Sequence, residues 1–140
     1  MIKYNQLPDN ILQLLPEAVT YLHSHPKVIF SYLFGSLSKG KPSPLSDVDI
    51  AVFLKKAEKV ADRKMEILGR LIEILETDEI DLVILNTANL PLAMGILKNR
   101  KLIVDKDTFA RHLFESLLMR KYFDFSINES VQLKRRYLDG

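Results

Sequence analysis

The sequence predicts an α/β fold in which a small sheet is flanked by helices. Short apolar runs rich in β-branched and aromatic residues alternate with segments whose apolar residues recur at helical spacing. The first apolar run leads directly into Gly35-Ser36, the second carries Asp47 and Asp49, and the third is interrupted by Asp81. Because α/β sheets bind ligands at their strand ends, these residues form the candidate functional site.

Two elements precede the Gly-Ser pair. Residues 11–22 place apolar side chains at helical spacing after Asp9 and Asn10, either of which can cap a helix. We expect the helix to end before Pro26, because proline cannot continue it. Residues 28–33 then have the β-branched and aromatic composition of a strand, which leads into the pair.

A strand, a helix and a strand follow the Gly-Ser loop. Residues 46–54 predict the second strand, and residues 59–76 predict a strongly amphipathic helix. We expect this helix to cross over and cover the sheet, with Met65 in the core. Residues 79–85 predict the third strand, which carries Asp81.

The C-terminal part adds two helices and a short strand. Asn89 or Leu90 can begin a short helix over 91–99, residues 101–104 read as a strand, and a last helix runs through Met119 or beyond. The tail that follows interleaves basic and aromatic residues. Such a pattern can stack on nucleic acid, anchor a protein partner, or belong to a helix that packs its aromatic side chains inward.

Length and composition indicate one globular domain. A chain of 140 residues with 47% hydrophobic residues can bury one core, so we expect a single domain over 1–140. The formal charge is only +2, and we expect no direct nucleic-acid partner. There is no cysteine, residues 1–4 lack a secretory h-region, and no apolar run approaches the length of a membrane span. We therefore expect a cytoplasmic protein with no membrane contact.

The Gly-Ser pair can cradle phosphate. Gly35 has no side chain to block the approach of a triphosphate, and the Ser36 hydroxyl and the following amides can donate hydrogen bonds to phosphate oxygens. Lys39 is near enough along the loop to meet a phosphate, its alternative being a solvated loop charge. A Gly-Ser turn alone is common, so its meaning depends on the aspartates that follow.

The aspartates can hold a hard cation. Asp47 and Asp49 are two residues apart, so both carboxylates project from one face of a strand. Mg²⁺ prefers oxygen ligands and is usually held by one or two carboxylates together with substrate phosphates. A buried strand rarely carries an unpaired aspartate. If its strand lies beside that of Asp49, Asp81 can complete a two-metal site and activate the attacking group as a base.

These motifs resemble those of the minimal nucleotidyltransferases, a family of the DNA polymerase beta-like superfamily. The family signature is Gly-Ser, ten residues and then Asp-x-Asp, as in Gly35-Ser36 followed by Asp47 and Asp49, and the resemblance covers nearly the whole chain. In particular, the chain resembles the MntA-type antitoxins encoded beside a HEPN-domain ribonuclease toxin. The resemblance implies a polymerase beta-like fold with a small mixed sheet and a C-terminal helix.

The resemblance also implies an activity, which is transfer of AMP from ATP to a tyrosine hydroxyl of the partner HEPN toxin, silencing it. Carried over to this sequence, Gly35 and Ser36 would hold the nucleotide phosphates. Asp47, Asp49 and Asp81 would hold two Mg²⁺ ions and form the catalytic acids.

One stretch departs from the family pattern. Many relatives have Ala-Arg-Gly where this chain has Ser38-Lys39-Gly40. Lysine is a point charge without the planar fork of arginine, so nucleotide affinity or geometry is expected to differ.

Two alternatives to protein AMPylation remain open. One is an antitoxin that neutralises its toxin by binding and occlusion alone. The other is a nucleotidyltransferase that modifies a small molecule such as an aminoglycoside. The required acidic residues are all present, and the chain has no extra domain to build a small-molecule pocket, so the sequence favours catalysis on a protein acceptor.

Overall fold

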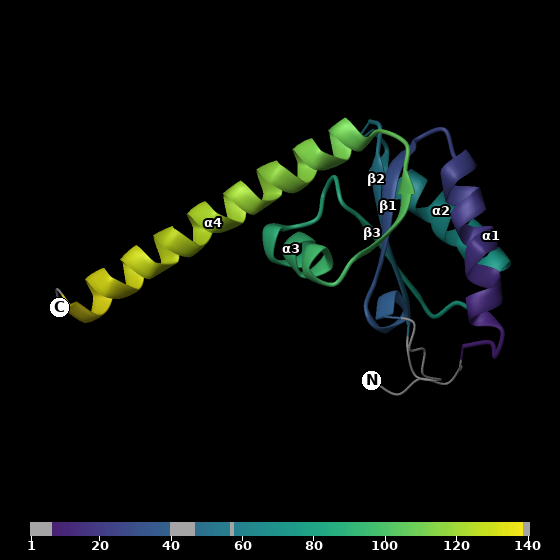
Figure 1. The fold of residues 1–140 in the computed structure, drawn as a ribbon, viewed down its shortest axis with the longest axis horizontal. Coiled ribbons are helices and arrows are strands. Elements are labelled where there is room, and N and C mark those ends of the chain that lie inside the picture. The colour runs from purple at the N-terminus through teal and green to yellow at the C-terminus, as the bar shows by residue number, and fades with distance from the viewer. Residues whose placement is uncertain (1–6, 40–46, 57, 139–140) are drawn as a thin grey trace.

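The computed structural model describes residues 7–39, 47–56 and 58–138, apart from the side chains of residues 39 and 136–138. Its elements are, in chain order, α1 (Ile11–Ser24), β1 (Val28–Phe34), the single 3-10 turn η1 (Ser36–Lys39), β2 (Val48–Leu54), α2 (Val60–Leu75), β3 (Ile80–Ile84), α3 (Leu90–Lys98), β4 (Lys101–Asp105) and α4 (Thr108–Leu138). The strands form one sheet in the order β3-β2-β1-β4, with α1 and α2 on one face and α3 and α4 on the other (Figure 1).

The sheet is mixed, as expected. β1 runs antiparallel to both β2 and β4, whereas β2 and β3 are parallel and are joined by α2 as a crossover helix. A parallel pair needs such a crossover because its strands start at the same end of the sheet. Asn86, just beyond β3, extends this pairing, since its side-chain amide exchanges hydrogen bonds of 2.8 and 2.9 Å with the backbone of Leu54.

The face under α1 and α2 holds the larger core. Alternate residues of the strands point to this face and meet the apolar stripes of the two helices, as period-2 and period-3.6 patterns require. The fully buried side chains of this core include Leu22, Val52, Ile67 and Leu71. The expectation for Met65 is wrong, because Met65 lies on the wet side of α2 and is 68% exposed.

The opposite face of the sheet is aromatic. Phe30 stacks on Phe53 with ring centroids 4.8 Å apart, and Phe114 of α4 lies across both rings at 5.6 and 5.1 Å. Offset aromatic contacts of this kind add to the free energy gained by burying apolar area. They fix the start of α4 on the sheet.

A group of charges around the buried Glu115 fastens α4 to the same face. Glu115 of α4 accepts hydrogen bonds from the Tyr32 hydroxyl (2.9 Å) and from Arg111 (3.0 Å), and it forms an ion pair with Arg100 (3.2 Å). Arg111 also pairs with Asp105 at 3.1 Å. Burial and the hydrogen bond to Glu115 raise the pKa of Tyr32 well above its usual range. Tyr32 therefore stays a neutral donor.

The predicted elements are all present, with small differences at their ends. Of the two residues expected to begin α3, Asn89 is the cap, and its side chain accepts from the Leu92 amide (2.9 Å). Asn10 occupies the cap position of α1, but its side chain makes no capping hydrogen bond. None of the described helices is long and apolar enough to cross a membrane.

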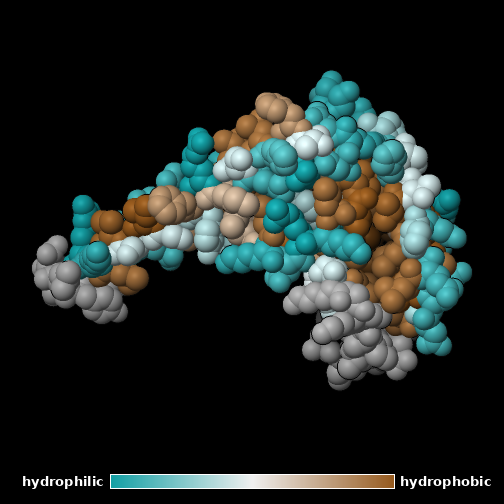
Figure 2. All heavy atoms as spheres, in the orientation of Figure 1, coloured by the Kyte–Doolittle hydropathy of each residue, from teal (hydrophilic) through white to brown (hydrophobic). Residues whose placement is uncertain are grey.

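The last helix extends well beyond Met119, the residue that we expected it at least to reach. α4 has 31 residues and projects from the body of the molecule (Figure 1), and Figure 2 shows apolar side chains recurring along it. Tyr122 is half-buried with Lys98 Nζ 5.3 Å from its ring centroid, whereas Phe123 and Phe125 are 64% and 45% exposed. The described part of the tail thus does not pack its phenylalanines inward.

We predict that Glu115→Gln destabilises the fold far more than Tyr32→Phe. The glutamine leaves Arg100 and Arg111 facing a neutral amide, which is expected to cost about 3 kcal/mol of unfolding free energy. The phenylalanine removes one hydrogen bond while Glu115 keeps both arginines, at a cost of about 1 kcal/mol. Chemical denaturation of the two variants measures the difference. Equal losses would show that the ion pairs contribute nothing beyond the tyrosine hydrogen bond.

Candidate functional site

The candidate phosphate cradle lies where β1 ends. Gly35 follows the strand, and η1 turns the chain immediately afterwards, with Ser36 exposed at its first position. Leu37 is 2% exposed and packs into the core under α1 and α2, which anchors the turn. A buried leucine between two polar residues leaves the Ser36 side chain on the surface next to the strand end.

Gly35 is required by its conformation and by its neighbour. Its φ is +72°, in the left-handed region that favours glycine. A Cβ at this position would overlap the Asp49 carboxylate, meeting Oδ2 far inside van der Waals distance. The backbone of the Gly-Ser turn and the Asp49 side chain therefore lie in direct contact.

The aspartates gather on one face of the sheet. Asp49 of β2 is paired with Phe34 of β1 on one side and with Asp81 of β3 on the other. Residues 49 and 81 share the face of Ala51 and Val83, which belong to the core under α3 and α4. Asp47, the residue before β2, is two residues away and half-buried like Asp49. The expected adjacency of the Asp49 and Asp81 strands is confirmed.

The surroundings of Asp81 differ from those expected for a buried strand. β3 is an edge strand, and Asp81 is exposed. It lines a groove of about 290 Å³, together with Lys64 of α2 and Thr87 after β3. The position of Asp81 thus follows from its register opposite Asp49, and solvent or a second molecule has access to it.

The donor set suits a hard cation such as Mg²⁺, because it consists of carboxylates beside a turn that presents amides and a hydroxyl. Within residues 7–39, 47–56 and 58–138, no three Asp, Glu, His or Cys side chains are arranged so that they could hold a metal ion by themselves. Phosphate oxygens of a nucleotide would supply the remaining ligands, as they commonly do for Mg²⁺.

The sequence prediction missed one contact of the turn. The Ser38 hydroxyl donates to the Gly35 carbonyl (2.6 Å) and lies 3.0 Å from the carbonyl of Asn99, which follows α3. Ser38 thus ties the Gly-Ser turn to the α3–β4 connection. The available signal in the sequence was a serine three residues after a glycine, because serine hydroxyls often hydrogen-bond to nearby backbone in turns. The Lys39 side chain lies outside the described residues, so its role as a phosphate contact stays a prediction.

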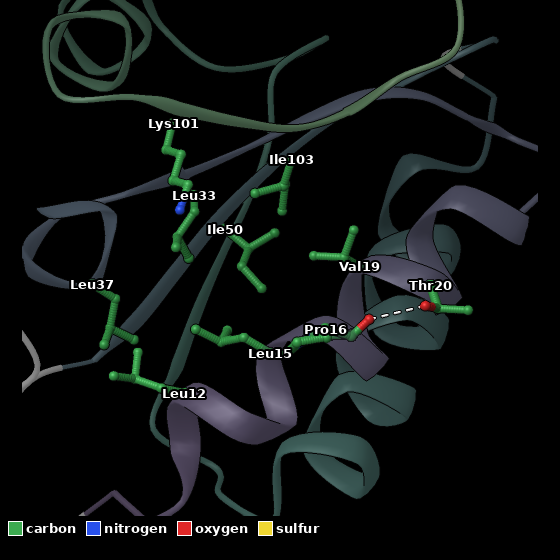
Figure 3. Close-up of a pocket in the computed structure, with 11 residues that line it drawn as sticks. Leu12, Leu15, Pro16, Val19, Thr20, Leu33, Leu37, Ile50, Lys101 and Ile103 are labelled. Carbon is green, nitrogen blue, oxygen red and sulfur yellow. Dashed lines mark hydrogen bonds between the residues drawn. The ribbon is translucent and has the colours of Figure 1, made fainter. Parts of the chain in front are cut away.

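An apolar cavity of about 570 Å³ lies on the other face of the sheet. Its walls come from α1, η1 and the strands, and Figure 3 shows Leu15, Val19, Leu33 and Ile50 around it, with Lys101 reaching in from β4. Leu33 and Ile50 alternate with Phe34 and Asp49 along their strands, so they point away from the aspartates. This cavity is separate from the acidic face.

This arrangement of a phosphate-binding turn and carboxylates is typical of a nucleotidyltransferase. A comparison with protein families agrees. Residues 17–109 match the family model described as polymerase beta, nucleotidyltransferase, and the chain belongs to this family. No curated protein sequence is significantly similar.

Solved structures share the fold over most of the chain. One chain of a toxin–antitoxin crystal structure with AMP-PNP is 25% identical, with a TM-score of 0.65 and 90% of this chain and 94% of that one covered. A chain from the toxin–antitoxin MntA-HpeT carrying a tyrosine-to-alanine substitution is 27% identical, with a TM-score of 0.63 and coverage of 92% and 97%. A chain from a complex of a tri-AMPylated Shewanella oneidensis HEPN toxin with an MNT antitoxin is 24% identical, with a TM-score of 0.59 and coverage of 90% and 92%. The resemblance to MntA-type proteins is thereby confirmed.

We predict that Gly35→Ala destabilises the fold by roughly 1–3 kcal/mol, because the alanine must adopt a positive φ and its Cβ meets Asp49. Combining it with Asp49→Ala removes the overlap, so the double variant should lose less stability than the sum of the single variants. Chemical denaturation of the four proteins measures this coupling.

Gly69→Ala is the matched control. Gly69 lies in α2 with nothing within 4 Å of an added Cβ, so this substitution should stabilise the protein by roughly 0.5–1 kcal/mol. Additive losses in the Gly35 and Asp49 variants would contradict the contact between the two residues.

Proposed function

We propose that this protein transfers AMP from ATP to a tyrosine hydroxyl of a partner HEPN-domain toxin and thereby neutralises it. The observation that carries the proposal is the contact of the Gly35 turn with Asp49 and the register of Asp49 opposite Asp81. A phosphate held at the turn would be adjacent to both carboxylates. Residues 1–140 act as one nucleotidyltransferase domain in this proposal.

The side chains divide the work of binding. The amides after Gly35 and the Ser36 hydroxyl donate hydrogen bonds to the nucleotide phosphates, and Lys39 adds a positive charge. Asp47, Asp49 and Asp81 would hold Mg²⁺ together with phosphate oxygens of the nucleotide, and we expect two ions. When bound, the metal would supply charge neutralisation at the transferring phosphoryl group. Most of the catalytic effect comes from positioning and fixed charge, which suits a small protein.

The reaction is an in-line displacement at the α phosphorus of ATP. The acceptor oxygen forms a bond to this phosphorus while the bond from the phosphorus to the α,β-bridging oxygen breaks, and the β and γ phosphates leave as pyrophosphate. Asp81 accepts the proton of the acceptor hydroxyl, because it is the exposed carboxylate beside the site. The products are the AMP ester of the acceptor and pyrophosphate.

A protein acceptor suits the position of the carboxylates. Asp81 lies on an edge strand and lines an open groove, so a side chain carried by a second protein can reach it. Structural relatives of this chain include toxin–antitoxin complexes, one with AMP-PNP and one with a tri-AMPylated HEPN toxin. These relatives support the choice of ATP as donor and of a HEPN toxin as partner.

We predict that the HEPN-domain toxin with which this protein forms a complex gains mass in whole AMP units when incubated with this protein, Mg²⁺ and ATP. Asp47→Asn and Asp49→Asn should each lower the rate by at least about 100-fold, because each removes a charge that holds the metal. Intact-mass spectrometry of the partner follows the reaction, and omission of Mg²⁺ should abolish it.

Asp62→Asn provides the control, because Asp62 is an exposed aspartate in the first turn of α2, on the side of the helix opposite Val60 and Lys64, which line the Asp81 groove. It should leave the rate unchanged. A partner that keeps its mass yet is bound and neutralised, with the Asp49→Asn variant equally effective, would replace AMPylation by occlusion. Transfer of AMP to a small hydroxylated molecule but not to the partner would favour a small-molecule acceptor.

A further inference from the structure

The projecting helix α4 carries a continuous stripe at heptad spacing. The intervals between its members alternate between four and three residues, which is the spacing of the a and d positions of a coiled coil. The stripe spans about 27 Å along the helix. Its members are Leu113, Leu117, Arg120, Asp124, Ile127 and Val131.

This heptad stripe faces away from the body of the protein. Phe114 and Leu118 pack toward the sheet and α3, on the opposite side of the helix. The apolar members of the stripe are 41–49% exposed, with Leu113 at 49%, Leu117 at 43% and Val131 at 41%. A narrow stripe with this spacing is typical of a helix that pairs with one other helix.

The stripe is complementary to a second copy of itself that runs in the opposite direction. Counted outward from residue 122, Leu117 has Ile127 at the mirrored position, Leu113 has Val131, and Arg120 has Asp124. In an antiparallel pair of helices, an a position of one chain meets a d position of the other, and the mirrored pairs have this relation. The four apolar layers and the two charged layers at the centre then match across a two-fold axis.

We propose that α4 forms an antiparallel coiled coil with α4 of a second copy of this chain. Leu117 of each copy packs on Ile127 of the other, and Leu113 packs on Val131. Two Arg120–Asp124 pairs lie between the chains at the centre. The inference is independent of the transfer reaction, since the stripe lies on the side of α4 away from the sheet.

The central charged layer selects this partner and this alignment. In a parallel pair, or in an antiparallel pair shifted by one heptad, Arg120 and Asp124 would meet like charges or apolar side chains and lose their hydrogen bonds. A single polar layer in an apolar stripe specifies register and orientation in this way, at some cost in stability. A stripe built only of leucine would accept many partners.

The part of α4 that projects from the body also needs a packing partner to be stable. Residues 123–135 are all exposed, and an isolated helical segment of this length is marginal in water. In the antiparallel arrangement, this half of one helix lies on the half of the other that is fixed by the body. Each copy thereby supports the exposed half of its partner.

Charge exchange tests the pairing. Sedimentation of the full chain should show a concentration-dependent dimer, and Arg120→Asp or Asp124→Arg alone should raise the dimer dissociation constant at least about tenfold, because like charges then face each other. An equimolar mixture of the two variants should dimerise again, since each variant supplies the charge that the other lacks.

Cross-linking tests the direction of the helices. The chain has no cysteine, so introduced cysteines report without interference. Leu117→Cys mixed with Ile127→Cys should form a disulfide-linked dimer under mild oxidation, and Leu117→Cys alone should not. A parallel pair would give the reverse result and overturn the proposal.

Glu129→Arg is the matched control, because Glu129 lies on the opposite side of α4 from the stripe. It should leave both association and the helix content measured by circular dichroism unchanged, whereas each charge variant alone should lose helix signal that their equimolar mixture regains. A full chain that stays monomeric at every concentration overturns the proposal. A mixture of the two charge variants that fails to dimerise also overturns it. So do stripe variants that bind the HEPN partner less tightly while their self-association is unchanged.

Discussion

The contact between Gly35 and Asp49 governs the arrangement of the candidate site. The strand β1 can end in a tight turn against β2 only because residue 35 adopts a positive φ and has no Cβ. The same contact brings the carboxylate of β2 to the amides of the turn. The parallel pairing of β2 and β3 then sets Asp81 beside Asp49, so one close approach and one register define the acidic face.

Much of this was predictable because the signals are local. Helical spacing, strand composition and turn residues predicted the described α-helices and strands but not the 3-10 turn η1, and Asn89 was one of two residues proposed to begin α3. The spacing of Asp47 and Asp49 predicted a shared face, and the interruption at Asp81 predicted a third carboxylate nearby. Each inference needed only alternation along a strand and one assumption about neighbouring strands.

What escaped prediction depends on contacts between distant segments. Met65 belongs to an apolar pattern, yet the rotation of α2 on the sheet leaves it in solvent. The exposure of Asp81 follows from β3 being an edge strand, which no local pattern reveals. The link from Ser38 to Asn99 joins residues 61 positions apart. The grouping of Tyr32, Arg100, Arg111 and Glu115 likewise appears only once β1, β4 and α4 are assembled.

The sheet separates the residues of the larger apolar core from the aspartates of the candidate site. The larger apolar core lies under α1 and α2, whereas the aspartates point to the other face, near the edge strand β3. Substitutions at exposed positions beside Asp81, such as Thr87 and Leu92, can therefore accumulate without replacing residues of that core. Such a scaffold is suited to evolutionary change, because a lineage can alter the surface beside the aspartates while it retains the fold.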